Sequence, residues 1–147
     1  MFRTILAATA AVALASPVLA ADFQSIPSDK PVADTMDALV AAVEGAGATV
    51  FARVDHAEGA ASVDMELPAA QLLIFGNPQL GTRAMQDDLR AGVMLPLRVL
   101  VYDDEGQTQV LWPEMDDMFD DLTIPDDADY VEKMKGALQT LTGKAVE

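Results

Sequence analysis

Apolar and polar positions follow two different periods along the chain, and the first helix is the clearest case. Ser28 and Pro31 are typical of a helix start, Asp34 lies where a carboxylate favours the helix dipole, and Gly45-Ala46-Gly47 ends the run. Between them the apolar residues recur at helical spacing: Val32, Met36, Leu39, Val40 and Val43. A second amphipathic helix is predicted near the C-terminus, docked through Tyr130, Met134, Leu138 and Leu141.

The remaining apolar segments have the pattern of strands, either alternating or short and continuous. They cover residues 22–26, 49–54, 71–75, 97–102 and 108–112. The last two flank Asp103-Asp104-Glu105-Gly106, which predicts a β-hairpin with a four-residue loop. Gly76-Asn77-Pro78 predicts a turn before a short helix over 80–89, whereas 56–66 is a polar, alanine-rich stretch. Strands joined by hairpins, with helices on one face, define a single small α+β domain.

The N-terminus has the three parts of a secretory signal peptide. Arg3 supplies the positive start, 5–15 is almost entirely apolar, and Val18-Leu19-Ala20 places small residues at a cleavage site. The apolar run is shorter than the roughly 20 residues that span a bilayer, although an uncleaved anchor is the alternative. We therefore expect a signal peptide over 1–20, a mature domain over 21–147, and a location in the periplasm.

Charge narrows the range of partners. The chain carries 9 Lys and Arg against 24 Asp and Glu, a net charge of −15. Nucleic acids and anionic membrane surfaces require a basic patch, so neither is an expected partner. The absence of cysteine excludes disulfides, thiol catalysis and thiolate metal sites.

Two segments carry a family resemblance. FGNPQLGT (75–82) and LPLRVLVYDDEG (95–106), with His56-Ala57 upstream, resemble the exported branch of the domain of unknown function family 302. The resemblance implies a twisted antiparallel sheet in an arrangement like that of the TATA-binding protein, without its DNA-binding role. It also implies a possible homodimer, and no known activity. After Trp112 the match fades into acidic residues where many relatives carry a basic residue and a histidine.

His56 is the candidate catalytic residue. It is the single histidine of the chain, and histidine is the side chain best suited to act as a general base near neutral pH. In an enzyme of this kind, Asn77 or Arg98 would polarise the substrate. The alternative is that His56 caps the turn and helix that follow it. Neither GxSxG nor SxxK is present to supply a nucleophile.

The turn after residue 75 is the candidate ligand site. Asn77 can bond its own backbone, and Gly76 and Gly81 allow close approach of the main chain to a ligand. Exposed N–H groups there could hold a carboxylate or phosphate, with Arg98 as the counter-charge. The alternative is a plain strand-to-helix turn with Thr82 as the N-cap. Arg98 opens an apolar strand, so we expect it to be partly buried and paired.

The acidic C-terminal segment, 116–147, raises the question of a metal. Its carboxylates are Asp116, Asp117, Asp120, Asp121, Asp126, Asp127 and Asp129. Helical spacing would place Asp116 with Asp120 and Asp117 with Asp121, and oxygen ligands at this density suit calcium. The EF-hand pattern is absent, however, so a solvated acidic surface is the prediction, with no metal and no cofactor.

These observations favour a non-catalytic periplasmic binding or interaction module for a small, possibly anionic, ligand or a protein partner. An enzyme that uses His56 as its base is the first alternative, and a calcium-dependent or structural acidic surface protein is the second. Convergence of His56, Asn77 and Arg98 on one pocket would favour the enzyme.

Overall fold

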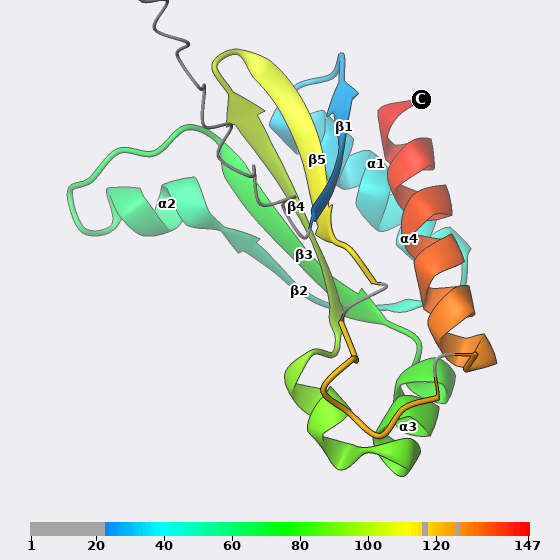
Figure 1. The fold of residues 1–147 in the computed structure, drawn as a ribbon. Coiled ribbons are helices and arrows are strands. Elements are labelled where there is room, and N and C mark those ends of the chain that lie inside the picture. The colour runs from blue at the N-terminus through cyan, green and yellow to red at the C-terminus, as the bar shows by residue number, and fades with distance from the viewer. Residues whose placement is uncertain (1–22, 116–117, 126) are drawn as a thin grey trace, which may run out of the picture.

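One five-stranded antiparallel sheet organises the fold (Figure 1). The computed structural model describes residues 23–115, 118–125 and 127–147, so the predicted signal peptide and Asp116, Asp117 and Asp126 lie outside the described residues. The strands are β1 (Phe23–Ser28), β2 (Thr49–Asp55), β3 (Ala70–Gly76), β4 (Leu97–Asp104) and β5 (Gln107–Pro113). Their spatial order is β1-β5-β4-β3-β2, so the first strand lies at one edge beside the last.

The helices are distributed unequally around the sheet. They are α1 (Val32–Gly45), α2 (His56–Ala61), α3 (Pro78–Asp87), the 3₁₀ helix η1 (Leu89–Val93) and α4 (Asp129–Val146). The two long helices, α1 and α4, pack together on one side of the sheet (Figure 1). On the other side α2 projects away, and α3 with η1 lies beyond one end of the strands. The mixed α+β class and the single small domain are confirmed.

Side-chain alternation divides the sheet into two faces, which we call the helix face and the open face. In β4, the helix-face residues are buried: Leu97, Val99 and Val101. The open-face residues are half-buried or exposed: Arg98, Leu100 and Tyr102. On the helix face they meet the apolar stripes of α1 and α4, and all four predicted docking residues of α4 are buried. Burial of these stripes supplies most of the stability of the domain.

The β4–β5 hairpin is tighter than its sequence predicts. Its loop is Glu105-Gly106, two residues rather than four, and both have positive φ (52° and 94°). Positive φ at both central positions is the conformation of a type I′ turn, which matches the twist of the flanking strands. The Asp103 carboxylate accepts a bond of 2.8 Å from the Gly106 N–H. Asp103 and Asp104 belong to β4, because they pair with Thr108 and Gln107 of β5.

Two local predictions differ from the structure. The stretch after β2 contains a short helix, α2, which begins where the Asp55 carboxylate accepts from the Glu58 N–H. In the acidic segment, residues 118–123 form turns rather than helix, so the expected helical pairing of Asp120 and Asp121 with their predecessors does not apply there. In the part of the chain that is described, no helix is long and apolar enough to cross a membrane.

Candidate functional site

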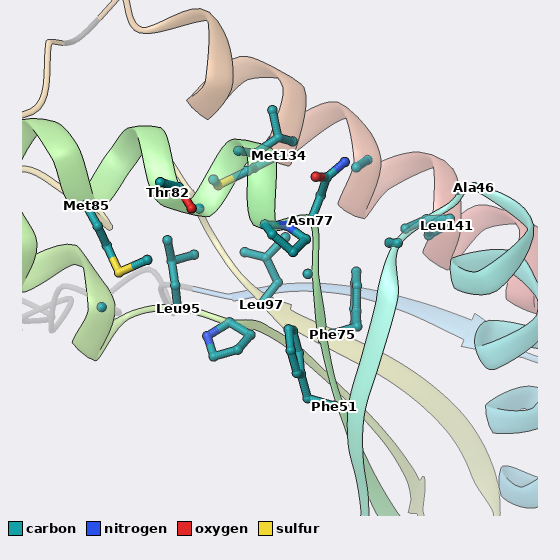
Figure 2. A pocket seen from close by; sticks show the side chains of 18 residues that line it. Ala46, Phe51, Phe75, Asn77, Thr82, Met85, Leu95, Leu97, Met134 and Leu141 are labelled. Carbon is teal, nitrogen blue, oxygen red and sulfur yellow. The ribbon is translucent and has the colours of Figure 1, made fainter.

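A pocket of about 330 Å³ opens at the end of the sheet where β3 passes into α3 (Figure 2). Its walls come from the end of β2, the β3–α3 turn, the segment before β4, and one face of α4. The apolar side chains that form most of the lining are Phe51, Phe75, Leu80, Met85, Leu95, Pro96, Leu97, Met134 and Leu141. The pocket therefore offers an apolar surface that is partly enclosed by elements distant in sequence.

Asn77 and Thr82 are the polar side chains in the lining, and both are exposed at its rim. The side-chain oxygen of Asn77 (Oδ1) accepts from the Gln79 N–H at 2.9 Å and so caps α3, with Pro78 as the first helical residue. Asn77 is therefore the N-cap, and the alternative of Thr82 as the cap is wrong because Thr82 lies inside α3. The Asn77 side-chain amide still has its N–H groups to offer a ligand.

Gly76 and Gly81 contribute space rather than unusual backbone geometry. Neither has a positive φ. A Cβ placed at Gly76 would lie 3.6 Å from both Phe51 and Pro96, and one at Gly81 would lie 3.8 Å from Leu95. These are ordinary contact distances to residues of the pocket wall. A larger side chain at either position would therefore extend into the pocket.

A polar cluster fixes α3 against α4 beside the pocket. Asp129 pairs with Arg83 (Nη2 to Oδ1, 2.7 Å) and with Lys133 (Nζ to Oδ2, 2.9 Å), and hydrogen bonds from these two cations lower its pKa to about 2. The Tyr130 hydroxyl donates to Asp87, and the Arg83 guanidinium lies 5.1 Å from the centre of the Tyr130 ring. Burial and the Asp87 carboxylate raise the pKa of Tyr130 to about 12. The cluster holds the outer wall of the pocket in place.

Asp88 secures the segment that follows α3. Its carboxylate accepts from the Arg90 N–H at 3.0 Å, which caps η1, and from the Thr123 N–H at 3.0 Å. It also pairs with the Arg90 guanidinium, and these hydrogen bonds hold the pKa of Asp88 well below its usual range. One carboxylate thus ties the acidic loop to the end of α3.

Arg98 is not part of this pocket. It lies on the open face of β4, directly opposite Ile74 of β3, whereas its neighbour Leu97 points to the pocket. The expectation that the Arg98 guanidinium is partly buried is wrong. Arg98 is exposed and no ion pair joins it to another described residue. The reason is that none of the described helices covers the open face, so a long cationic side chain reaches solvent there.

His56 is also remote from the pocket. It is exposed at the start of α2, at the end of β2 opposite to the end that lines the pocket (Figure 1). The side-chain cap of α2 is Asp55, not His56, and the same carboxylate accepts from Gln71 at 2.9 Å. His56, Asn77 and Arg98 therefore do not converge. Among the described residues, no group of three or more acidic or histidine side chains has the geometry to hold a metal ion.

The candidate residues Gly76, Asn77, Gly81 and Thr82 all line the pocket, but sequence reasoning missed its apolar walls. Phe51 and Leu95 lie in segments that the pattern treats only as a strand and a connection. Phe51 is 55% exposed and lies in the edge strand β2 at the point where the register with β3 shifts, between Val50 and Ala52. An irregularity of this kind leaves no signal in the hydrophobic pattern.

Fold and site together define a class: a small α+β domain with an apolar pocket at one end of a five-stranded antiparallel sheet. The chain belongs to the family described as domain of unknown function DUF302, whose model matches residues 24–141. In a solved structure, an uncharacterized conserved DUF302 protein from Bacillus stearothermophilus has the same fold, with a TM-score of 0.77 at 17% identity. That match covers 84% of this chain and 98% of the other.

Curated relatives match over a shorter segment. Proteins named fluoride-specific ion channel FluC 1, from Brucella suis biovar 1 (strain 1330) and Brucella abortus biovar 1 (strain 9-941), are 42% identical over 80 residues. This segment is 54% of the present chain and 32% and 30% of those proteins, respectively. The match thus spans about a third of the length of the curated relatives.

Proposed function

We propose that this domain is a non-catalytic binding module that holds a small, uncharged and mainly apolar molecule in the pocket beside Asn77. The observation that carries the proposal is the lining: apolar side chains from distant elements, with two polar groups at the rim. Its volume of about 330 Å³ falls at the lower end of the range found for small-molecule sites. Asn77 and Thr82 would orient a ligand that carries one carbonyl or hydroxyl group.

The charges of the site favour an uncharged ligand over the anion considered from sequence. None of the residues in the lining is charged, and Arg98, the expected counter-charge, lies on the open face. Transfer of a carboxylate or phosphate into an apolar pocket without a cation is costly. The enzyme alternative has less support, because His56 lies at the other end of β2. We place the module in the periplasm, on the strength of the Val18-Leu19-Ala20 pattern.

Thermal unfolding with a panel of compounds tests the proposal. Uncharged aromatic and short aliphatic alcohols and ketones are compared with the matching carboxylates. A ligand present at a hundred times its Kd stabilises the folded state by about 2.7 kcal/mol. We expect members of the uncharged set to raise the melting temperature and the carboxylates to leave it unchanged.

A matched pair of leucine variants assigns the effect to the pocket. Gly81→Leu places a side chain into the lining, whereas Gly136→Leu makes the same change on the exposed side of α4, where a Cβ meets nothing within 4 Å. Both replace a helical glycine by a strong helix former, so both variants should fold. Gly81→Leu should abolish the ligand-induced shift and Gly136→Leu should keep it. Equal shifts in the two variants, or a response to carboxylates alone, would contradict the proposal.

A second candidate function comes from the channel-named relatives. The segment that they share with this chain is less than a third of their length, at 42% identity. In the described part of this chain, no helix is suited to cross a membrane. We infer that the domain acts beside a membrane channel of the kind for which those proteins are named. None of the residues that line the pocket is charged, so the pocket is not assigned to fluoride.

A further inference from the structure

The open face of the sheet is apolar at its centre, and none of the helices in the described part of the chain lies over it. Its central positions are half-buried: Leu72, Ile74, Leu100 and Leu111. At its two edges Phe23 is 53% exposed and Val54 is 37% exposed. The strand register places Leu72 opposite Leu100, and Leu100 opposite Leu111, so these side chains form one continuous surface across three strands. Contiguous apolar surface of this kind marks an interaction site.

A second apolar surface lies on the segment that projects from the same side of the sheet. We call residues 56–69, which comprise α2 and the loop that returns to β3, the arm (Figure 1). The loop presents three strongly exposed apolar side chains: Val63 (63%), Met65 (66%) and Leu67 (55%). Two acidic residues, Asp64 and Glu66, alternate with them, and a third, Glu58, lies in the first turn of α2. The arm is therefore apolar at its tip and negatively charged.

The central part of the open face carries a positive charge, although Asp104 at the end of β4 lies on the same face. Arg98 lies in it opposite Ile74, exposed and without an ion pair to any described residue. Among the open-face positions of β3 and of β4 from Arg98 to Tyr102, Arg98 alone is charged. One surface thus combines apolar side chains with a free cation, and the other combines apolar side chains with free carboxylates.

We propose that the domain forms a two-fold symmetric homodimer in which the arm of each copy packs on the open face of the other. Arg98 would pair across the interface with an acidic residue of the arm, for which we name Glu66 because Met65 and Leu67 flank it. In a two-fold dimer each such contact is made twice. The proposal is independent of the pocket, whose lining includes neither Arg98 nor any arm residue.

A second copy fits these surfaces better than an unrelated acidic partner, because both complementary halves occur on one chain. A net charge of −15 opposes association of two copies in general. Self-association therefore requires a local arrangement that brings opposite charges together, and the pairing of Arg98 with the arm supplies one. Burial of the side chains of Val63, Met65 and Leu67 would add a hydrophobic contribution to the free energy of association. Charged pairs at the rim of an interface do not supply this contribution.

Sedimentation equilibrium of the protein as purified from its expressing cells tests the dimer. We expect the wild type to be dimeric at micromolar concentration. Arg98→Glu should weaken association by at least about tenfold, because it opposes like charges at two equivalent positions. The double variant Arg98→Glu with Glu66→Arg should restore the dimer. Thermal unfolding of each variant shows whether it is folded.

Lys144→Glu is the matched control. It changes the net charge by the same amount on an exposed position of α4, on the other side of the sheet, and should leave the dimer intact. A monomeric wild type, an unaffected Arg98→Glu dimer, or equal weakening by Lys144→Glu would each overturn the proposal. Weakening by Arg98→Glu without rescue by Glu66→Arg would overturn the named pairing.

Discussion

Tyr130 is the residue whose ionisation depends most directly on the packing of α3 against α4. Burial and the bond to the Asp87 carboxylate raise its pKa from 10.0 to about 12. Between these values the unfolded chain loses the tyrosine proton while the folded chain retains it. The stability from this group is therefore complete below pH 10 and is lost as the pH rises towards 12.

An alkaline absorbance titration checks this expectation, because the chain has two tyrosines. Tyr130→Phe should remove the transition near pH 12. Asp87→Asn should lower the pKa of Tyr130, since it removes the negative charge that opposes formation of the tyrosinate. Stability of Asp87→Asn should correspondingly depend less on pH between 10 and 12. An unchanged late transition in Asp87→Asn would show that burial alone sets the pKa.

Also at the scale of single residues, the sequence predicts on which face of β4 Arg98 lies but not whether that face is covered. Alternation correctly places it on the face shared with Leu100 and Tyr102. Whether that face is covered depends on where α1 and α4 dock, and the strand pattern holds no information on this choice. The four candidate residues at the β3–α3 turn are brought together because turn chemistry is local. The walls opposite them come from α4 and β2, which are distant in sequence.

Among the elements, the β4–β5 hairpin gives a sharp prediction. Gly106 has φ of 94° and Glu105 has φ of 52°, and a side chain at either position is strained. Asn-Gly is the preferred sequence of a type I′ turn, so Glu105→Asn should stabilise the domain, by roughly 0.5 kcal/mol. Gly106→Ala should cost about 1 kcal/mol.

Urea unfolding of the two hairpin variants measures both effects. Gly45→Ala serves as the control, because Gly45 has no positive φ and its Cβ would meet nothing within 4 Å. A Gly106→Ala variant as stable as the wild type would show that the turn adopts another conformation.

The elements with strong periodicity could be predicted, whereas the hydrophobic pattern gives no indication of α2. In α1 and α4 the apolar stripe extends over several turns, and each helix is found close to its expected bounds. By contrast, α2 has six residues and no buried one, so it has no stripe to detect. Its start is marked by Asp55, whose carboxylate accepts from the Glu58 N–H three residues on, a local capping signal that the sequence analysis did not use.

At the scale of the whole molecule, an association with a fluoride channel is open to direct test. The tagged protein is co-expressed with the fluoride channel of its own organism, and detergent-solubilised membranes are passed over the tag. We expect the channel to be retained, and cells lacking the domain to tolerate less fluoride. Retention of an unrelated membrane protein to the same extent, or unchanged fluoride tolerance, would contradict the second candidate function.

The position of β1 beside β5 has a consequence for the order in which the chain can fold. Phe23–Ser28 is synthesised first, yet its one neighbour in the sheet is the last strand, Gln107–Pro113. While the ribosome adds the residues between them, the opening strand has nothing to pair with, and closure of the sheet must bridge almost the entire domain. Such non-local pairing slows folding. In a nascent chain of this topology, the opening strand therefore stays unpaired until the hairpin that contains β5 has been synthesised.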